Sequence, residues 1–251
     1  MSVRKTFCIG LCLAMQAWAT QSTPFAPGET SSYEVSYFGI PMGEAQIKVG
    51  AALQQAEQRV WPVIFIGRTK PFQPYQINDK LVTYWNPETK KSTGIDLFID
   101  ENKKRRREKI KLNHQSNTAF VTRQKEGESP NSTRYTINPE TTEVAAAALF
   151  LRHQALHKGQ TFELPIFTGR KNFNLKIRVA QKQQLQTRLG TMEAVLILAR
   201  PEFDGSLAPK RDIRIFVSAD ERHIPLLIEA DLVLGKLVVE IVRYVPGEPP
   251  T

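Results

Sequence analysis

The chain has 251 residues, enough to bury a substantial core in one large domain or two small ones. Its 34 basic and 25 acidic residues give a formal net charge of +9 at pH 7. This surplus favours anionic partners such as phospholipid headgroups, lipopolysaccharide phosphates or acidic glycans, although it also suits a purely solubilising role. Both cysteines, Cys8 and Cys12, lie in a segment that we expect to be removed, which excludes a disulfide framework in the mature protein.

The first 19 residues have the layout of a secretory signal peptide. Arg4 and Lys5 form a positive head, and residues 6–17 form an apolar stretch. This stretch is shorter than the roughly 20 residues that cross a bilayer as a helix. Ala17 and Ala19 occupy the two small-residue positions of a cleavage site, so we expect cleavage after Ala19.

Cleavage would leave 32 basic and 25 acidic residues, a net charge of +7, because Arg4 and Lys5 are removed. A lipoprotein signal requires a small residue before its cysteine, whereas Leu11 precedes Cys12 and Phe7 precedes Cys8. We therefore expect a periplasmic protein without a lipid anchor or a transmembrane segment. Export also argues against a nucleic-acid partner.

The chain divides into four segments by composition. Residues 20–30 and 247–251 are rich in Ser, Thr, Pro and Gly, and we interpret them as a flexible leader and a tail. Residues 31–246 contain no linker, low-complexity tract or internal repeat. We therefore predict a single β-rich domain over residues 31–246, after the signal peptide of residues 1–19.

Alternating apolar and polar residues dominate this domain. The alternation runs through residues 44–49, 173–179 and 213–217, as in strands with one buried and one wetter face. Residues 195–198 and 237–242 are more continuously apolar, as in strands covered on both faces. With turn residues between these segments, the pattern predicts a mainly β fold of about 12–14 strands in a single curved antiparallel sheet, a half-barrel or open barrel.

A dense group of cations follows a predicted turn at residues 100–102. We expect a hairpin with arms at residues 95–99 and 105–112. Cations on both faces of a strand cannot be buried without acids, so this segment should be an exposed edge or a projecting hairpin. The alternative to a binding role is protection of a free edge against aggregation. The candidate contact for an anionic partner consists of Lys103, Lys104, Arg105, Arg106, Arg107 and Lys109.

We predict one helix in the chain, over residues 140–158. Asn138 can cap it, Pro139 suits the first helical position, and Gly159 can end it. A single amphipathic helix must bury its apolar stripe, so we expect a central helix across the mouth or the concave face of the sheet. The stripe consists of Val144, Ala148, Leu151 and Ala155.

Residue types that serve catalysis or metal binding occur here without a supporting pattern. His153 and His157 share a helix face but lack the intervening acid of a zinc-protease helix. Ser218 lies outside a nucleophile-elbow motif, and residues 220–223 have the composition of a polar turn. No glycine-rich phosphate loop is present. We therefore assign no catalytic, cofactor-binding or metal-binding residues, and we expect a protein that is not an enzyme.

Six stretches between Tyr33 and Tyr244 form an ordered set: residues 33–45, 149–152, 158–159, 187–194, 216–229 and 234–237. In this order they resemble the DUF3108 family of exported bacterial proteins of unassigned biochemistry. Phe216 and Val217 stand where the family often has Trp and Leu. The resemblance implies a fold similar to the curved half-barrel lipoprotein carriers of the LolA and LolB type.

These observations favour a non-enzymatic periplasmic binding protein that holds a hydrophobic or amphiphilic, lipid-like ligand in a concave sheet. The scattered aromatic residues would line an open concavity or fill a closed core, and the sequence leaves both open. The alternative is an envelope interaction or scaffold protein. It would act through an exposed sheet edge or through the basic hairpin of residues 103–111, on an anionic envelope component.

Overall fold

The computed structural model describes residues 23–55, 57–202, 211–232 and 235–248. The signal peptide expected over residues 1–19, with its cleavage positions Ala17 and Ala19, lies outside the described residues. The described chain contains one helix, α1 (Val144–Arg152), and a set of antiparallel strands. No helix within this part of the chain has the length and apolar character needed to cross a membrane.

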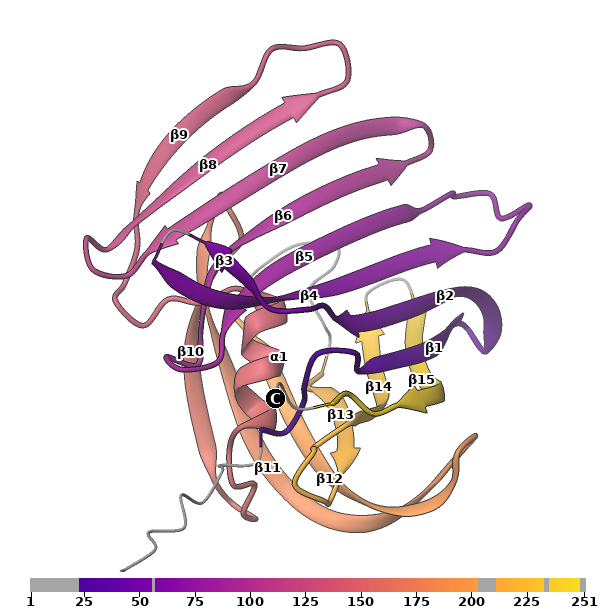
Figure 1. Ribbon diagram of the computed structural model, residues 1–251. Coiled ribbons are helices and arrows are strands. Elements are labelled where there is room, and N and C mark those ends of the chain that lie inside the picture. Colours follow the sequence, from indigo (N-terminus) through magenta and orange to yellow (C-terminus); the bar gives the residue numbers. More distant parts are fainter. Residues whose placement is uncertain (1–22, 56, 203–210, 233–234, 249–251) are drawn as a thin grey trace, which may run out of the picture.

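The strands join into one antiparallel sheet of 15 strands (Figure 1). Strand β1 forms hydrogen bonds with both β2 and the C-terminal strand β15, so it connects the two halves of the chain. In chain order the strands are β1 (Thr30–Tyr37), β2 (Ile40–Val49), β3 (Leu53–Gln55), β4 (Gln58–Thr69), β5 (Asn78–Asn86), β6 (Lys91–Glu101), β7 (Lys104–Asn113), β8 (Thr118–Lys125), β9 (Asn131–Thr136), β10 (Thr161–Phe167), β11 (Asn172–Thr187), β12 (Gly190–Pro201), β13 (Ile213–Ser218), β14 (Pro225–Leu232) and β15 (Gly235–Val245).

The sheet bends around α1 without closing. Its strand order is β10-β11-β12-β13-β14-β15-β1-β2-β4-β5-β6-β7-β8-β9, with β3 beside β4, so β9 and β10 are its two edges. In Figure 1, β4 to β9 form the upper part of the molecule, β10 to β15 the lower part, and α1 lies between them. The predicted single curved antiparallel sheet with one central helix is therefore confirmed, with 15 strands in place of 12–14.

The helix is shorter than predicted at both ends. Thr142, expected inside the helix, instead forms a bridge with Ile166 of β10. Glu143 is the N-cap in place of Asn138, whose side chain accepts a hydrogen bond from the backbone of Glu140 in a turn. At the other end the predicted helix was wrong beyond Arg152. The backbone N–H groups of residues 153 and 154 donate to carbonyl oxygens three residues earlier, which ends the α-helix in a tighter turn.

Part of the predicted flexible leader is packed against the body. Phe25 and Glu29 are buried, and the backbone of Val49 exchanges hydrogen bonds with Gly28 and Glu29. At the other end of the domain, Glu248 of the predicted tail donates its backbone N–H to Pro27. Ser, Thr and Pro content therefore did not identify a loose segment here, because Phe25 is an apolar anchor within it.

Candidate functional site

The helix α1 packs one face tightly against the upper half of the sheet. Ala146 and Leu149 join a buried cluster with Trp61 and Trp85, and Phe25 from the N-terminal segment completes it. The ring centroid of Phe25 lies 6.0 Å from that of Trp61 and 6.1 Å from that of Trp85. On this side the concavity is therefore filled by the protein's own side chains.

The N-terminus of α1 is held by a buried carboxylate. Glu143 accepts hydrogen bonds from the backbone N–H groups of Ala145 (2.7 Å) and Ala146 (2.9 Å). The hydroxyl of Thr83 on β5 donates to the same carboxylate at 2.5 Å. Burial raises the pKa of Glu143 to about 7, although these three donors favour the charged form. The cap therefore attaches α1 to the upper half of the sheet.

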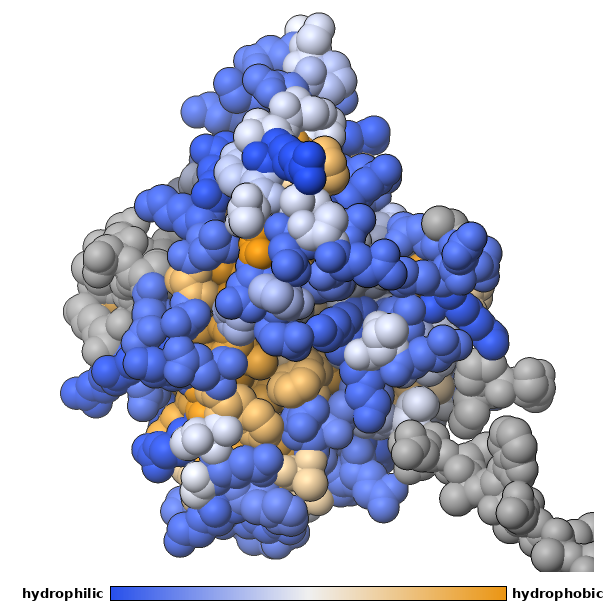
Figure 2. All heavy atoms as spheres, turned by 90° about the vertical axis from the view of Figure 1, so that its left-hand side faces the viewer, coloured by the Kyte–Doolittle hydropathy of each residue, from blue (hydrophilic) through white to orange (hydrophobic). Residues whose placement is uncertain are grey.

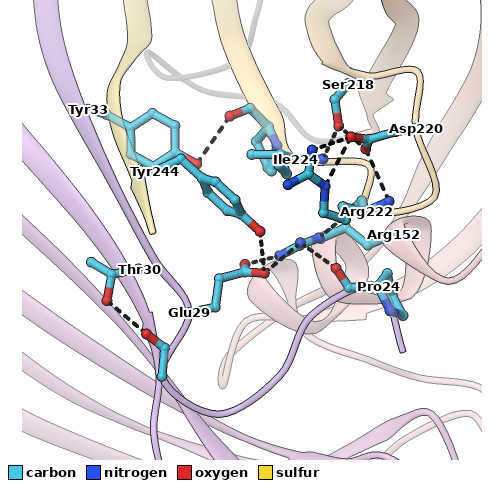
Figure 3. Close-up of polar contacts among 12 residues, drawn as sticks. Pro24, Glu29, Thr30, Tyr33, Arg152, Ser218, Asp220, Arg222, Ile224 and Tyr244 are labelled. Atoms are coloured by element: carbon cyan, nitrogen blue, oxygen red, sulfur yellow. Dashed lines mark hydrogen bonds and ion pairs between the residues drawn. The ribbon is translucent and has the colours of Figure 1, made fainter. Parts of the chain in front are cut away.

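The C-terminus of α1 is held by a buried ion pair (Figure 3). The guanidinium of Arg152 donates to both carboxylate oxygens of Glu29, at 2.6 and 3.1 Å. It also donates to the carbonyl oxygens of Pro24 (2.8 Å) and Arg222 (2.9 Å). Tyr244 of β15 donates its hydroxyl to Glu29 at 3.1 Å. These hydrogen bonds compensate the desolvation of both charges and join α1 to three separate segments.

The opposite face of α1 borders an apolar cavity of about 360 Å³. This face carries Val144, Ala147, Ala148 and Leu151, at the i, i+3, i+4 and i+7 spacing of one helical stripe. The far wall comes from β11, β12, β13 and β14. Its aliphatic residues include Ile177, Ile197, Ala199, Ile213, Ile215, Ile228 and Leu232.

The cavity is open to solvent on the side of the helix. Val144 at its margin is 59% exposed, although it belongs to the apolar stripe that the sequence predicted to be buried. Figure 2 shows hydrophobic residues gathered at the height of α1 and the lower strands, framed by hydrophilic ones. The apolar stripe predicted on the helix is therefore present at Val144, Ala148 and Leu151. These residues line a cavity, whereas the sequence predicted that they would be buried.

Only two polar side chains line the cavity among the described residues, Arg152 and His223. The guanidinium of Arg152 is engaged by Glu29 and two carbonyl groups. The Nδ1 atom of His223 lies 3.0 Å from the carbonyl oxygen of Arg152. The remaining lining is apolar, so the arrangement suits a hydrophobic group better than a charged one.

The aromatic residues divide between core and cavity. Trp61 and Trp85 are buried in the filled side, whereas Phe173 of β11 lines the cavity. Both alternatives left open by the sequence therefore occur, one on each side of α1. The apolar periodicity of the helix did not identify which side of α1 borders a cavity, because the packing partners of α1 come from strands far away in sequence.

The predicted basic hairpin is present but is not a sheet edge. β7 pairs with β6 on one side and β8 on the other. Arg105, Arg107 and Lys109 alternate along β7 with the buried Ile110 and therefore lie on the face away from the core. The edge interpretation was wrong because β8 and β9 follow β7 and cover it.

The predicted contact residues do not form one cluster of free charges. Arg105 pairs with Asp100 (3.2 Å) and Glu126 (3.4 Å), Arg106 with Glu101 (3.8 Å), and Lys109 with Asp96 (3.8 Å). The guanidinium of Arg107 lies 4.9 Å from the ring centroid of Phe98. Lys103 and Lys104, at the turn, have no ion pair within the described residues.

The residues weighed for catalysis or metal binding do not come together in one site. Ser218 donates its hydroxyl to Asp220 at 2.7 Å and accepts from the backbone N–H of Ile224, which forms the expected polar turn. His153 stacks on Trp85 with ring centroids 5.5 Å apart, whereas His157 is exposed. No group of three or more potential metal ligands occurs within the described residues.

Three solved structures are similar to this chain at low sequence identity. A β-barrel-like protein of domain of unknown function DUF1849 from Brucella abortus has a TM-score of 0.61 and 11% identity, covering 89% of this chain and 99% of that one. A putative exported protein with a YmcC-like fold from Bacteroides fragilis has a TM-score of 0.38 and 7% identity, covering 88% and 97%. A putative lipoprotein from Parabacteroides distasonis has a TM-score of 0.32 and 10% identity, covering 89% and 98%.

A comparison with curated proteins finds no match. The Brucella abortus structure supports the shared fold and carries no information on a ligand. The model of the family described as "Protein of unknown function (DUF3108)" matches residues 32–242, nearly the whole of the β domain. This agrees with the resemblance found in the sequence, and the chain belongs to the DUF3108 family.

Proposed function

We propose that this protein is a non-enzymatic binding protein that holds the apolar part of a lipid-like ligand in the cavity beside α1. The observation that carries the proposal is a cavity of about 360 Å³ with an almost wholly aliphatic lining. Small-molecule sites occupy about 300–1,000 Å³ and combine apolar walls with a few polar groups. Here the polar groups lie at one end of the cavity, where Arg152 and His223 are found.

The placement of the helix supports this function. α1 is held at both ends by buried groups, Glu143 and Arg152, and so is a rigid wall of the cavity. Its stripe leaves Val144 and Ala148 exposed at the opening. Covering such residues with a hydrocarbon chain is favourable by about 25 cal/mol for each Å² of apolar surface removed from water. We place this activity in the periplasm, on the N-terminal signal pattern.

Native mass spectrometry of the gently extracted protein tests the proposal. We expect a bound mass in the lipid range, and a mass shift when the stripped protein is mixed with phospholipid. Ala148→Phe places a ring at the opening of the cavity and should abolish both signals. Ala155→Phe is the matched control, since Ala155 is exposed and does not line the cavity. A clean apo mass for the wild type, unchanged by lipid, would contradict the proposal.

A second candidate is an envelope interaction protein that acts through the outer face of the basic hairpin. A hollow of about 660 Å³ on that face is lined by several cations and by Phe98. The cations are Arg68, Lys80, Arg105, Arg106, Arg107 and Lys125. Acidic residues Asp79, Asp100 and Glu126 share the lining, so the hollow keeps a smaller net positive charge.

In-cell cross-linking tests this second candidate. Reproducible adducts should form through Lys80 or Lys125, and the double variant Arg105→Gln with Arg107→Gln should lose them. Lys158→Gln with Lys171→Gln is a control of equal charge, because both lysines are exposed and lie outside the hollow. Adducts that persist in the arginine variant would exclude this face as the contact.

A further inference from the structure

Three connections meet at one end of the upper half of the sheet, at the right-hand ends of the strands in Figure 1. They are the β1–β2 connection, the β4–β5 connection and the β6–β7 turn. The backbone N–H of Lys70 donates to the carbonyl of Met42 at 2.8 Å, and that of Asn102 donates to the carbonyl of Gln76 at 2.9 Å. These bonds link the β4–β5 connection to the start of β2 and to the β6–β7 turn. We call residues 38–42, 70–77 and 101–104 the aromatic rim.

Large apolar side chains project from this rim. Phe72 is fully exposed, and Phe38, Ile40 and Tyr75 are 67%, 60% and 50% exposed. Both Phe38 and Phe72 have a positive φ, 52° and 67°, which is uncommon and costly for a bulky residue. Phe38 contacts the ring of Tyr37 at one side, but most of its surface stays in solvent, and Phe72 has no burial at all. Exposed apolar residues gathered in this way mark a surface that contacts another phase or molecule.

Unpaired positive charge accompanies these aromatic residues. Lys103 and Lys104 lie at the β6–β7 turn, are exposed, and have no ion pair within the described residues. The nearest acid of the rim, Glu101, is engaged by Arg106 at 3.8 Å and by the hydroxyl of Tyr75 at 3.3 Å. The charge left for an external partner at this turn is therefore positive.

We propose that the aromatic rim docks on the surface of an anionic phospholipid bilayer. Aromatic side chains are favourable in the interfacial region, where their rings leave water while polar atoms stay hydrated. Lysines near the surface are attracted to anionic headgroups over about one Debye length. The combination of projecting aromatic residues with unpaired lysines complements such a surface in both apolar character and charge.

One residue of the rim, Phe38, contacts a strand pair that contributes to the cavity wall, although the proposal does not depend on what that cavity holds. The ring of Phe38 lies against the backbone of Gly235, where an added Cβ would overlap the ring. Gly235 pairs in register with Leu232, which lines the cavity. Docking through the rim would therefore bring one wall of the cavity close to the bilayer.

Co-sedimentation with vesicles tests the rim. We expect the wild-type protein to bind vesicles of phosphatidylcholine mixed with phosphatidylglycerol, with affinity that falls as salt is raised, and to bind phosphatidylcholine alone weakly. Phe38→Ser with Phe72→Ser should lower partitioning about tenfold or more, because two rings are removed from the interface. Lys103→Glu with Lys104→Glu should lower it by a similar factor.

Matched controls separate the rim from general stickiness and charge. Phe120→Ser removes an aromatic ring that is 46% exposed on β8, outside the rim, and Lys158→Glu with Lys171→Glu reverses two exposed charges elsewhere. Both should bind as the wild type does. Equal losses in the control and rim variants, or no loss in the rim variants, would overturn the proposal.

A tryptophan at the rim gives a second readout that does not rely on loss of binding. Phe72→Trp places an exposed indole in the rim, against the background emission of the buried Trp61 and Trp85. Its emission should shift to shorter wavelength with anionic vesicles, and an unchanged spectrum would contradict insertion. Ala148→Phe should keep vesicle binding while losing the bound lipid mass, so failure of one proposal is distinguishable from failure of the other.

Discussion

The guanidinium of Arg152 and the carboxylate of Glu29 form a bidentate ion pair between the last residue of α1 and the residue that precedes β1. Their side chains are 6% and 3% exposed, so both charges are removed from water. Phe25 lies beneath the guanidinium, 4.9 Å from its central carbon to the ring centroid. This pair positions the N-terminal segment, α1 and the β13–β14 turn relative to one another.

Breaking this pair should destabilise the whole domain. Arg152→Ala leaves the carboxylate of Glu29 buried with Tyr244 as its one side-chain donor among the described residues. We expect a loss of about 3–5 kcal/mol in the free energy of unfolding, the usual cost of an uncompensated buried charge. Urea titration followed by tryptophan fluorescence measures it, because Trp61 and Trp85 lie in the adjoining core.

An exposed ion pair provides the control for that measurement. Arg200 and Asp212 approach to 2.5 Å, but the side chain of Arg200 is 60% exposed. Arg200→Ala should therefore cost less than about 1 kcal/mol. Equal losses in the two variants would show that the Arg152–Glu29 pair contributes no more than a surface pair.

The buried cap of α1 should make stability depend on pH. The pKa of Glu143 is raised from 4.5 to about 7 by burial, so the folded state keeps a proton that the unfolded state has lost. Between about pH 4.5 and 7 this group therefore lowers the free energy of unfolding as pH rises. Glu143→Gln should remove that decrease, measured as urea midpoints across this range. Glu140→Gln is the control, since Glu140 is exposed.

His153 should act in the opposite direction over an overlapping range. Burial, followed by the charges of Lys90 and Arg152, lowers the pKa of His153 to about 4. The unfolded state then binds the proton more readily, so this group reduces stability as pH falls from about 6.5 to 4. His153→Phe keeps the stacking on Trp85. The variant should lose less stability on acidification than the wild type, whereas His157→Phe should behave as the wild type.

Gly94 in β6 cannot carry a side chain at its present geometry. Its φ is +152°, and an added Cβ would overlap the carbonyl oxygen of Ile110 on β7. Gly94→Ala should cost about 2–4 kcal/mol through backbone strain and displaced pairing. Gly67→Ala in β4 should change stability by less than about 0.5 kcal/mol, because nothing lies within 4 Å of its Cβ position. Thermal unfolding of both variants gives the comparison.

Local sequence patterns predicted where the strands and the helix lie better than they predicted which residues contact one another. The alternation in residues 173–179 and 213–217 lies in β11 and β13, and the stripe of Val144, Ala148 and Leu151 faces one side. The cap at Glu143 was missed although two of its donors, the backbone N–H groups of Ala145 and Ala146, are local, whereas its third donor, Thr83, is 60 residues away in sequence. A carboxylate directly before an alanine-rich run is a local signal that could have located it.

The candidate site depended on contacts that no local pattern reveals. In the sequence Arg152 is only part of a helical stretch, and its partner Glu29 lies in a segment whose composition indicated a loose leader. The cations of the basic hairpin indicated an exposed edge or a projecting hairpin, but whether β7 is an edge depends on the later strand β8, which pairs with it. Exposure of Phe38 and Phe72 likewise results from turn geometry rather than from composition.

The place of β1 between β15 and β2 has a consequence for how this protein matures. Hairpins such as β6–β7 and β7–β8 need only neighbouring residues and can pair as soon as they emerge. Tyr33 of β1, in contrast, donates to the carbonyl of Pro225, 192 residues further along, and β15 is later still. The sheet can therefore be completed only after almost the entire chain is available for pairing.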